Sequence, residues 1–169
     1  MPEFLREGNA IHDFYNPPYT LVGYDQMEGI HIVEELFSFL SAPLIRVEVK
    51  IVELIKLISN SYHALKVSFA NEMNLICDKL GIDYDKVVEY SIYDERLGKS
   101  HWAVPGPDGH YGFGGSCFPK DINALIKIAE KMDIPPNILS AAWDTNTLVR
   151  PEQDWKKLKG RAVVDEEKA

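Results

Sequence analysis

The sequence predicts a mainly α (α+β) fold, in which a long central helix with additional helices follows a residual β-α-β piece. The first observation is that residues 48–80 contain no proline or glycine and carry apolar residues at helical intervals. The second is that two short apolar segments, separated by a stretch of helical periodicity, precede this helix. The third is that two further segments of helical periodicity follow a long loop rich in glycine and proline.

The N-terminal segments predict part of a parallel sheet. Residues 19–24 (YTLVGY) form the first predicted strand, after a turn-prone Asn-Pro-Pro sequence. Residues 26–40 carry the helical periodicity and residues 43–47 form the second strand, an order typical of the edge of a parallel sheet. Because two strands do not make a stable sheet alone, we expect this unit to be incomplete.

The central helix is predicted to be buried on more than one side. As one helix, residues 48–80 would span about 48 Å at a rise of about 1.5 Å per residue. Its middle, residues 57–71, is apolar on more than one side, and Lys66 is its only Lys, Arg, Asp or Glu. Such a helix is usually buried on all sides. We therefore expect it to pack between its own chain and a second copy, which predicts a homodimer.

The rest of the chain predicts shorter helices around one long loop. Gly81 is a natural C-cap of the central helix, and Asp83 can cap a short helix over residues 84–93. A loop as long as residues 94–116 is uncommon in a compact domain unless it has a function. Two more helices are predicted at residues 119–132 and 136–148, before a peripheral charged tail from which Trp155 could still dock.

The composition is typical of a globular protein with one domain, or one domain and a fragment of another: 169 residues, 46% hydrophobic and 26% charged. The 26 acidic residues exceed the 18 basic ones and give a formal charge of −8, which argues against nucleic acid as a partner.

The two cysteines and five scattered histidines lack metal-ligand spacing, so no metal is expected. No signal peptide or membrane-spanning apolar stretch is found, so we expect no membrane partner and a reducing cytoplasmic location.

The segment GFGGSCFPKD, residues 112–121, carries the strongest candidate for chemistry. It places Cys117 between a glycine-rich loop and a predicted helix start, with Pro119 at the first helical position and Asp121 in the first turn. A thiol that faces a helix N-terminus, with Lys120 nearby, should lose its proton more easily than an ordinary cysteine. The glycines let the backbone approach a ligand closely and offer N–H groups to phosphate or sugar oxygens.

Simpler interpretations of the cysteines stay open from these residues alone. An isolated cysteine beside glycines is more often part of the packing, and Cys77, among apolar residues of the central helix, is assigned to the core. A thiol hydrolase built on Cys117, His110 and Asp121 is a weaker alternative, because nothing in the glycine-rich loop orients the histidine.

Three further groups are candidate site residues. Lys56 and Asn60 stand four apart and share one face of the central helix. Burial there would lower the pKa of the lysine and suit it for proton transfer, although its stem could equally lie along apolar surface. Glu3 and Glu7, also four apart, could form a carboxylate face or an exposed helical start. Arg96, in DERLGKS, could bind a phosphate or carboxylate with its planar fork, or be a solvated charge.

Four segments resemble one protein family and follow each other in that family's order. GFGGSCFPKD resembles the catalytic-cysteine motif of the nucleotide-sugar 6-dehydrogenases, the UDP-glucose and GDP-mannose dehydrogenases, and PEFLREGNAIHDFYNPP resembles their segment near the end of the cofactor domain. ELIKLISNSYHALKVSFANEM resembles their central helix with its Lys-x-x-x-Asn pair, and DERLGKS resembles the segment before the cysteine loop. The matches span residues 2–148, and the phenylalanine after Cys117 favours the UDP-glucose branch over GDP-mannose.

The resemblance implies oxidation of a sugar C6 alcohol to a carboxylate, with two NAD and a covalent thioester. Cys117 would be the nucleophile that captures the aldehyde as a thiohemiacetal. Lys56 and Asp121 would handle protons and, with Asn60, stabilise the oxyanion and position a water. Glu3 would act in proton transfer during thioester hydrolysis. The resemblance also implies substrate contacts from Phe4, Leu5, Arg6, Glu7, Tyr111, Gly112, Phe113 and Gly114, a substrate contact from Arg96 of the other subunit, and a cofactor contact from Lys120.

The resemblance divides the chain into three parts. Residues 1–47 would be the C-terminal remnant of a Rossmann-type NAD-binding domain, residues 48–148 a central helical catalytic and dimerisation domain, and residues 149–169 a charged tail. The sequence contains neither the G-x-G-x-x-G fingerprint of the NAD domain nor the second nucleotide domain of the family. We therefore expect the main NAD-binding domain to be absent and turnover by this chain alone to be weak or absent. The alternative is a noncatalytic dimerisation or substrate-binding module derived from the family.

Overall fold

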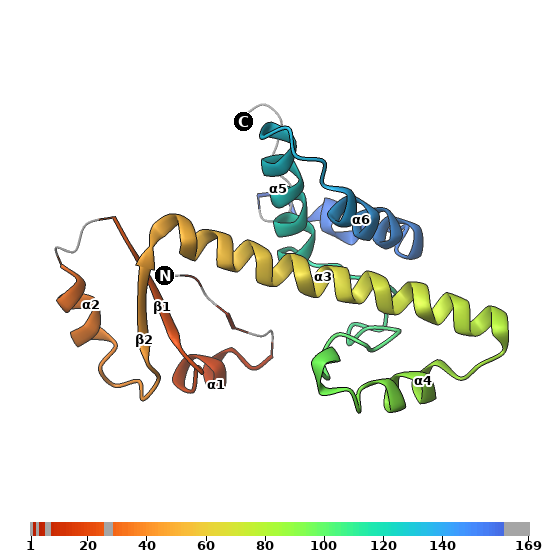
Figure 1. Cartoon of the computed structure of the whole chain (residues 1–169), viewed down its shortest axis with the longest axis horizontal. Helices are drawn as coiled ribbons and strands as arrows, with labels where there is room; N and C mark the ends of the chain where they lie inside the picture. The colour runs from red at the N-terminus through yellow and green to blue at the C-terminus, as the bar shows by residue number, and fades with distance from the viewer. Residues whose placement is uncertain (1, 3, 6–7, 26–28, 161–169) are drawn as a thin grey trace. The chain divides into compact units, whose positions relative to one another are not determined.

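The computed structural model of the protein describes all residues except 1, 3, 6–7, 26–28 and 161–169 (Figure 1). The fold is mainly α-helical with a small sheet, which confirms the predicted α+β class. The chain divides into two compact units, Met1–Ile58 and Ser59–Ala169. In chain order the elements are α1 (Ala10–Tyr15), β1 (Thr20–Tyr24), α2 (Ile30–Leu36), β2 (Leu44–Glu48), α3 (Val49–Leu80), α4 (Tyr84–Ser91), the 3-10 helix η1 (Glu95–Leu97), α5 (Cys117–Lys131), α6 (Asn137–Val149) and the 3-10 helix η2 (Asp154–Lys157).

The first unit contains the predicted β-α-β piece. β1 and β2 pair in parallel along their whole length, as the sequence predicts. The helix predicted over residues 26–40 is observed only as the shorter α2. This helix starts after Gly29 because the φ of 82° at that glycine does not belong to a right-handed helix. Residues 26–28 lie outside the described part of the chain. α1 is an additional short helix that the sequence analysis did not predict.

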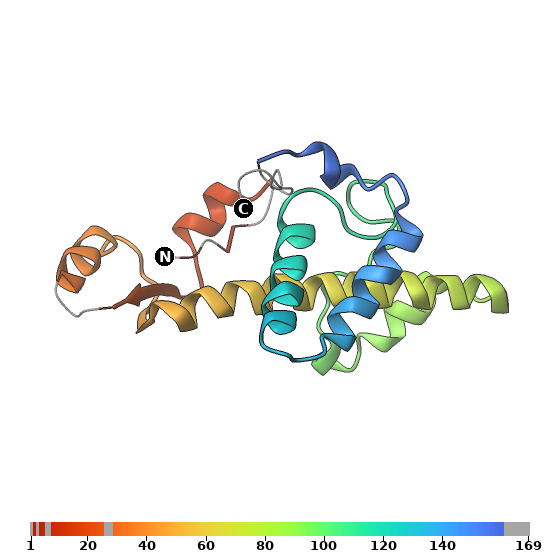
Figure 2. The same ribbon diagram turned by 90° about the horizontal axis from the view of Figure 1, so that it is seen from above.

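In the second unit, helices and loop pack on two sides of α3. α5 and α6 lie on one side of α3, and α4 with the following loop lies on the other (Figures 1 and 2). On the first side, Ala64 of α3 belongs to an apolar cluster with Ile122 of α5 and Ala142 of α6. On the second side, Cys77 of α3 belongs to a cluster with Tyr84 of α4. Cys77 is thus a core residue, which confirms its assignment.

The middle of α3 also has a face that its own unit leaves uncovered. The side chains of Tyr62 and Phe69 are large and apolar, yet these residues are 58% and 47% exposed. The chain therefore buries part of residues 57–71 and leaves an aromatic part open. Its burial against a second copy stays a prediction.

One of two helix starts predicted from local signals agrees with the structure. The Asp83 carboxylate accepts hydrogen bonds from the N–H groups of Asp85 and Lys86, which confirms the predicted cap of α4. The start of α5 was predicted at Pro119, but the helix begins two residues earlier, at Cys117. The ring of Pro119 is tolerated there because the first four N–H groups of a helix have no partner within it.

The loop between α4 and α5 is tied to α3 by Lys66. The Lys66 ammonium donates to the carbonyl of Leu97 at 2.9 Å and lies 4.9 Å from the centre of the Trp102 ring. The indole N–H of Trp102 donates to the carbonyl of Gly98 at 2.8 Å. Burial lowers the pKa of Lys66. The one charge in the middle of the helix therefore binds loop backbone, which needs hydrogen-bond partners when it is buried.

Residues 150–157 pack against the helices of the second unit, although the sequence predicts a charged tail there. Trp155 of η2 is buried, and its ring centre lies 5.2 Å from that of Trp143 in α6. The side chain of Arg150 is buried as well. The chain after α6 therefore contributes both apolar and charged groups to this unit.

His101 is a partly buried histidine in the same loop. Its ring stacks on that of His63, with centroids 4.1 Å apart and planes 9° apart, and its backbone φ is 65°. Burial, reinforced by the neighbouring His63 and Lys66, lowers the pKa of His101 to about 4.

The stability of the second unit should therefore fall as the pH falls from 6.5 toward 4. Unfolded His101 binds a proton below about pH 6.5, whereas the folded state binds it only below about pH 4. Because the unfolded state binds more protons in this window, acidification favours unfolding. We expect His101→Asn, which tolerates a positive φ, to flatten the pH dependence of the free energy of unfolding, measured by urea denaturation. His31→Asn, at an exposed position of α2, is the control; equal pH slopes in the two variants would contradict the assignment.

Candidate active site

Cys117 and Asp121 lie on one face of α5, at its start. Cys117 is the first residue of the helix and is exposed, whereas Asp121 lies one turn later and is 2% exposed. Residues four apart on a helix are neighbours on its surface. An accessible thiol therefore lies one turn from a buried carboxylate.

The Asp121 carboxylate is held by two other predicted site residues. Asn60 of α3 donates from Nδ2 to Oδ2 of Asp121 at 2.5 Å. The ammonium of Lys120 pairs with the other carboxylate oxygen. A buried carboxylate needs such partners to offset the loss of water. The fold thus brings Asn60, Lys120 and Asp121 together around the first turn of the helix that Cys117 begins.

Lys56 and Phe4 are neighbours in the first unit. The Lys56 ammonium lies 5.2 Å from the centre of the Phe4 ring, which is cation–π geometry. Phe4 and Leu5 also line an apolar cavity of about 420 Å³ in this unit. Two residues assigned to catalysis and substrate binding thus touch each other. The other predicted residues of this segment, Glu3, Arg6 and Glu7, lie outside the described residues.

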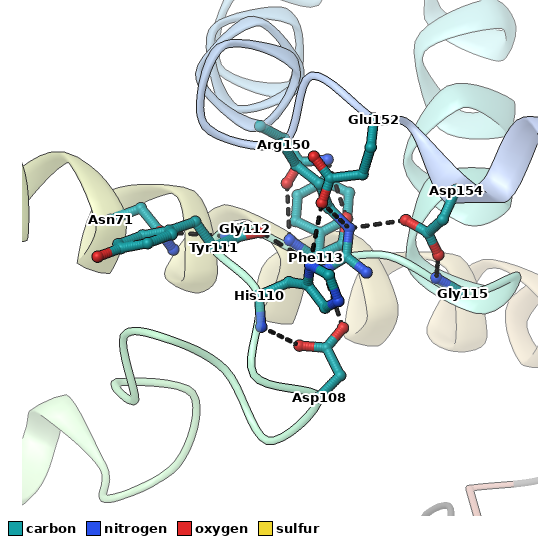
Figure 3. A network of polar contacts seen from close by, with 11 residues as sticks. Asn71, Asp108, His110, Tyr111, Gly112, Phe113, Gly115, Arg150, Glu152 and Asp154 are labelled. Atoms are coloured by element: carbon teal, nitrogen blue, oxygen red, sulfur yellow. Dashed lines mark hydrogen bonds and ion pairs between the residues drawn. The ribbon is translucent and has the colours of Figure 1, made fainter.

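The glycine-rich loop before α5 is bound by asparagine side chains of the same chain (Figure 3). The N–H of Gly112 donates to Oδ1 of Asn71 in α3 at 3.0 Å. The N–H of Phe113 donates to Oδ1 of Asn146 in α6 at 2.7 Å, and Nδ2 of Asn146 donates to the Phe113 carbonyl at 3.0 Å. The sequence predicts that N–H groups of this loop meet phosphate or sugar oxygens, but the N–H groups of Gly112 and Phe113 are used inside the protein.

The close approach of these side chains requires glycine in the loop. A Cβ on Gly112 would lie 2.4 Å from Oδ1 of Asn146, and a Cβ on Gly114 would lie 2.3 Å from Nη2 of Arg150. The ring of Phe113 is itself buried in the core with Ala64 and Ala142. Of the predicted substrate contacts in this loop, Tyr111 is the one with an exposed side chain.

Arg150, which follows the last residue of α6, is the centre of a charged network (Figure 3). The residue is 4% exposed, its Nε lies 2.7 Å from Oδ1 of Asp154, and its Nη1 lies 2.8 Å from Oδ2 of Asp108. Oδ2 of Asp154 accepts the N–H of Gly115 at 3.1 Å. Burial by itself raises the pKa of each carboxyl, but hydrogen bonds from backbone N–H groups and from Arg150 outweigh it, so both pKa values lie below the ordinary range.

His110 and Arg96 each contact a carboxylate on the surface. Nδ1 of His110 lies 3.1 Å from Oε1 of Glu152, so the described contacts of this imidazole give no support to a thiol hydrolase. The side chain of Arg96 is 89% exposed and donates through Nε and Nη2 to the two carboxylate oxygens of Asp94, at 2.8 and 2.6 Å. The planar fork predicted for anion binding is here closed on a neighbouring carboxylate.

The residues that hold the glycine-rich loop were missed by sequence reasoning. Helical spacing offered one signal, because Asn146 stands four residues after Ala142 on the buried face of α6. A buried amide implies a hydrogen-bond partner. Nothing in the sequence marks Arg150 as buried, since it opens a charged segment. The four missed residues are Asn71, Asn146, Arg150 and Asp154.

Two kinds of site are not found among the residues that the structure describes. No group of three or more His, Cys, Asp and Glu side chains in this part could hold a metal ion. None of the described helices combines the length and the apolar character needed to cross a membrane.

Comparison with known proteins defines the class. Residues 50–148 match the central domain of the UDP-glucose/GDP-mannose dehydrogenase family. The chain therefore belongs to this family, as its motifs predict.

Relatives named for UDP-glucose and relatives named for GDP-mannose both match the chain. The chain is 39% identical over 145 residues to UDP-glucose 6-dehydrogenase TuaD of Bacillus subtilis (strain 168), over 86% of this chain and 30% of the relative. It is 38% identical over 148 residues to GDP-mannose 6-dehydrogenase of Pseudomonas savastanoi pv. phaseolicola, over 86% of this chain and 33% of the relative. A solved structure of a UDP-glucose dehydrogenase from Pyrobaculum islandicum is similar with a TM-score of 0.80 and 34% identity, over 93% of this chain and 35% of that one. The chain thus spans about a third of the length of these relatives.

Replacement of Gly114 by alanine should disrupt the loop. The new Cβ would meet the guanidinium of Arg150 and, at 2.6 Å, Oδ1 of Asp154. The backbone φ at Gly114 is outside the left-handed range, so alanine would add no backbone strain. The expected loss is therefore steric, of about 1–3 kcal/mol in the free energy of unfolding. Gly106→Ala, in the same loop, is the control because its nearest contact would be 3.3 Å, to the Asp108 side chain. Urea denaturation measures both variants, and equal losses would contradict the steric account.

Proposed function

We propose that this chain is the catalytic core of a nucleotide-sugar dehydrogenase that oxidises UDP-glucose to UDP-glucuronate with two NAD. The observation that carries the proposal is the exposed Cys117 at the start of α5, one turn from the buried Asp121 that Asn60 binds. Membership of the family supports the dehydrogenase class. GDP-mannose is the alternative substrate, because relatives named for it match the chain about equally well.

Cys117 would act on the C6 aldehyde that the first oxidation produces. Its sulfur would bond to the aldehyde carbon, and the carbonyl oxygen would take a proton to give a thiohemiacetal. Loss of a hydride from that carbon and of the proton from its hydroxyl would leave a thioester, which water would split into the carboxylate and the free thiol. Asp121, fixed by Asn60, would exchange protons with the sugar oxygen or the water. The roles of Lys56 and Glu3 in oxyanion stabilisation and thioester hydrolysis rest on the family motif.

The chemistry that NAD would supply, when bound, is a hydride acceptor for the two oxidations. Among the residues of this chain only Lys120 is assigned to the cofactor, and its ammonium pairs with Asp121. The sequence has no glycine fingerprint to receive the phosphates of a dinucleotide. These residues do not fit a complete NAD site, so turnover would need contacts from a further nucleotide-binding domain.

The substrate would be cradled by Phe4 to Glu7 and by Tyr111 to Gly114, and a second copy of the chain would supply Arg96. The side chain of Arg96 is exposed enough to reach a neighbouring protomer. The uncovered aromatic face of α3 supports a homodimer built on that helix. The same face also favours the second candidate function, a noncatalytic dimerisation module.

UDP-glucose should protect Cys117 from alkylation although the chain alone makes little or no NADH from it. A bound sugar would cover the exposed thiol, whereas buried Cys77 serves as the internal reference. Peptide mass spectrometry after iodoacetamide treatment measures the protection, and GDP-mannose in a parallel reaction separates the two substrates. Robust NADH production would contradict the proposal that this chain alone is an incomplete catalytic core. If neither nucleotide sugar protected Cys117, the result would favour the noncatalytic module.

The chain should form a dimer that depends on Phe69. Phe69→Glu would bury an unpaired charge in the proposed interface and should weaken the dimer by about tenfold or more, equivalent to about 1.4 kcal/mol. Ile128→Glu, on α5, is the matched control because Ile128 is 42% exposed and Phe69 47%. Analytical ultracentrifugation across a concentration series measures both, and a monomer of the unaltered chain at high concentration rules the interface out.

A further inference from the structure

The charged network of Arg150 binds the loop that leads to Cys117 at both of its ends. At one end, Nη1 of Arg150 contacts Oδ2 of Asp108 at 2.8 Å and donates to the carbonyl of Tyr111 at 3.4 Å. At the other end, Asp154 links Arg150 to the N–H of Gly115, two residues before Cys117. Figure 3 shows these residues around the loop. The segment of residues 108–115 is therefore held by Arg150, which follows α6, and by Asp154 of η2.

The guanidinium of Arg150 is engaged by carboxylates of its own chain through Nε and Nη1. Its buried guanidinium faces three carboxylates, of Asp108, Asp154 and, at 3.8 Å, Glu152, and a phosphate would compete with them. Burial lowers the pKa of Arg150, but the ion pairs with Asp154 and Asp108 outweigh burial and raise it overall. Both carboxylates are at the same time kept ionised by Arg150 and by backbone N–H donors.

Arg150 is buried, whereas its partners Asp108 and Asp154 stay 48% and 35% exposed. The cost of taking the guanidinium out of water offsets much of the attraction, whereas loss of a carboxylate would leave the buried guanidinium without that partner. The planar fork of arginine can bind two carboxylates in fixed directions, which an ammonium cannot do. The position of residues 108–115 is consequently restricted by the directions of the Arg150 fork.

We propose that Arg150 and Asp154 are positioning residues that set the orientation of the Cys117 thiol at the start of α5. This inference rests on the proposed function, in which Cys117 is the nucleophile. Neither residue would touch the sugar or the cofactor. Their effect is transmitted through Gly115 and the first residue of the helix, and small displacements of a reacting group have large effects on rate.

The test compares the alkylation rate of Cys117 in variants of the full chain under native conditions. Asp154→Asn, which keeps the shape of the side chain, and Arg150→Met should each slow the reaction of Cys117 with iodoacetamide by about threefold or more, because the helix start that favours a reactive thiol is displaced. Arg150→Lys should give an intermediate rate, since an ammonium can replace one of the two ion pairs. The double variant Arg150→Met/Asp154→Asn should be no slower than the slower single variant, because both changes break the same link.

The control is Glu130→Gln, which breaks an exposed ion pair with Lys127 on the same helix, where the two groups are 2.7 Å apart. It should leave the alkylation rate unchanged. A purely structural role for Arg150 predicts lower stability to urea with unchanged alkylation rates in the folded variants, and that result overturns the proposal. A lack of UDP-glucose protection in the unaltered chain would count against the proposed function only, because the rate comparison between variants needs no substrate.

Discussion

Buried backbone polar groups must be hydrogen-bonded, and this requirement organises the second unit. The long segment between α4 and α5 contains only η1 as regular structure, yet it packs against α3. Several of its carbonyl and N–H groups are bound by side chains that helices present to it. Lys66 and Asn71 of α3 and Asn146 of α6 serve this purpose. A polar residue on a buried helix face is therefore the condition for burying an irregular loop.

The same requirement gives the glycines before Cys117 a second meaning. A glycine-rich loop is usually interpreted as room for a ligand. Here Gly112 and Gly114 make room first for Asn146 and Arg150, which approach the backbone too closely for any Cβ. A loop held in this way presents a defined surface, so its contribution to substrate binding would come from a preorganised shape.

Two buried charged groups fix the chain on either side of Cys117. Arg150 and its carboxylate partners hold the loop that precedes it, and Asp121, bound to Asn60 and Lys120, follows it by one helical turn. Neither group can move away without leaving a buried charge unpaired, which is costly. The cysteine is exposed to reagents while the backbone on both sides of it is fixed.

Local interactions determined what could be predicted from the sequence. The parallel strands, the length of α3 and the Asp83 cap of α4 follow from periodicity and capping. The family motifs predict one site with Cys117, Asn60 and Asp121, and the structure shows the hydrogen bond between Asn60 and Asp121. The start of α5, the burial of Trp155 and the roles of Asn71, Asn146 and Arg150 depend on groups far away in the chain. Only the tertiary structure could decide these, because a side chain's burial and its hydrogen-bond partners are set by whichever segments pack against it.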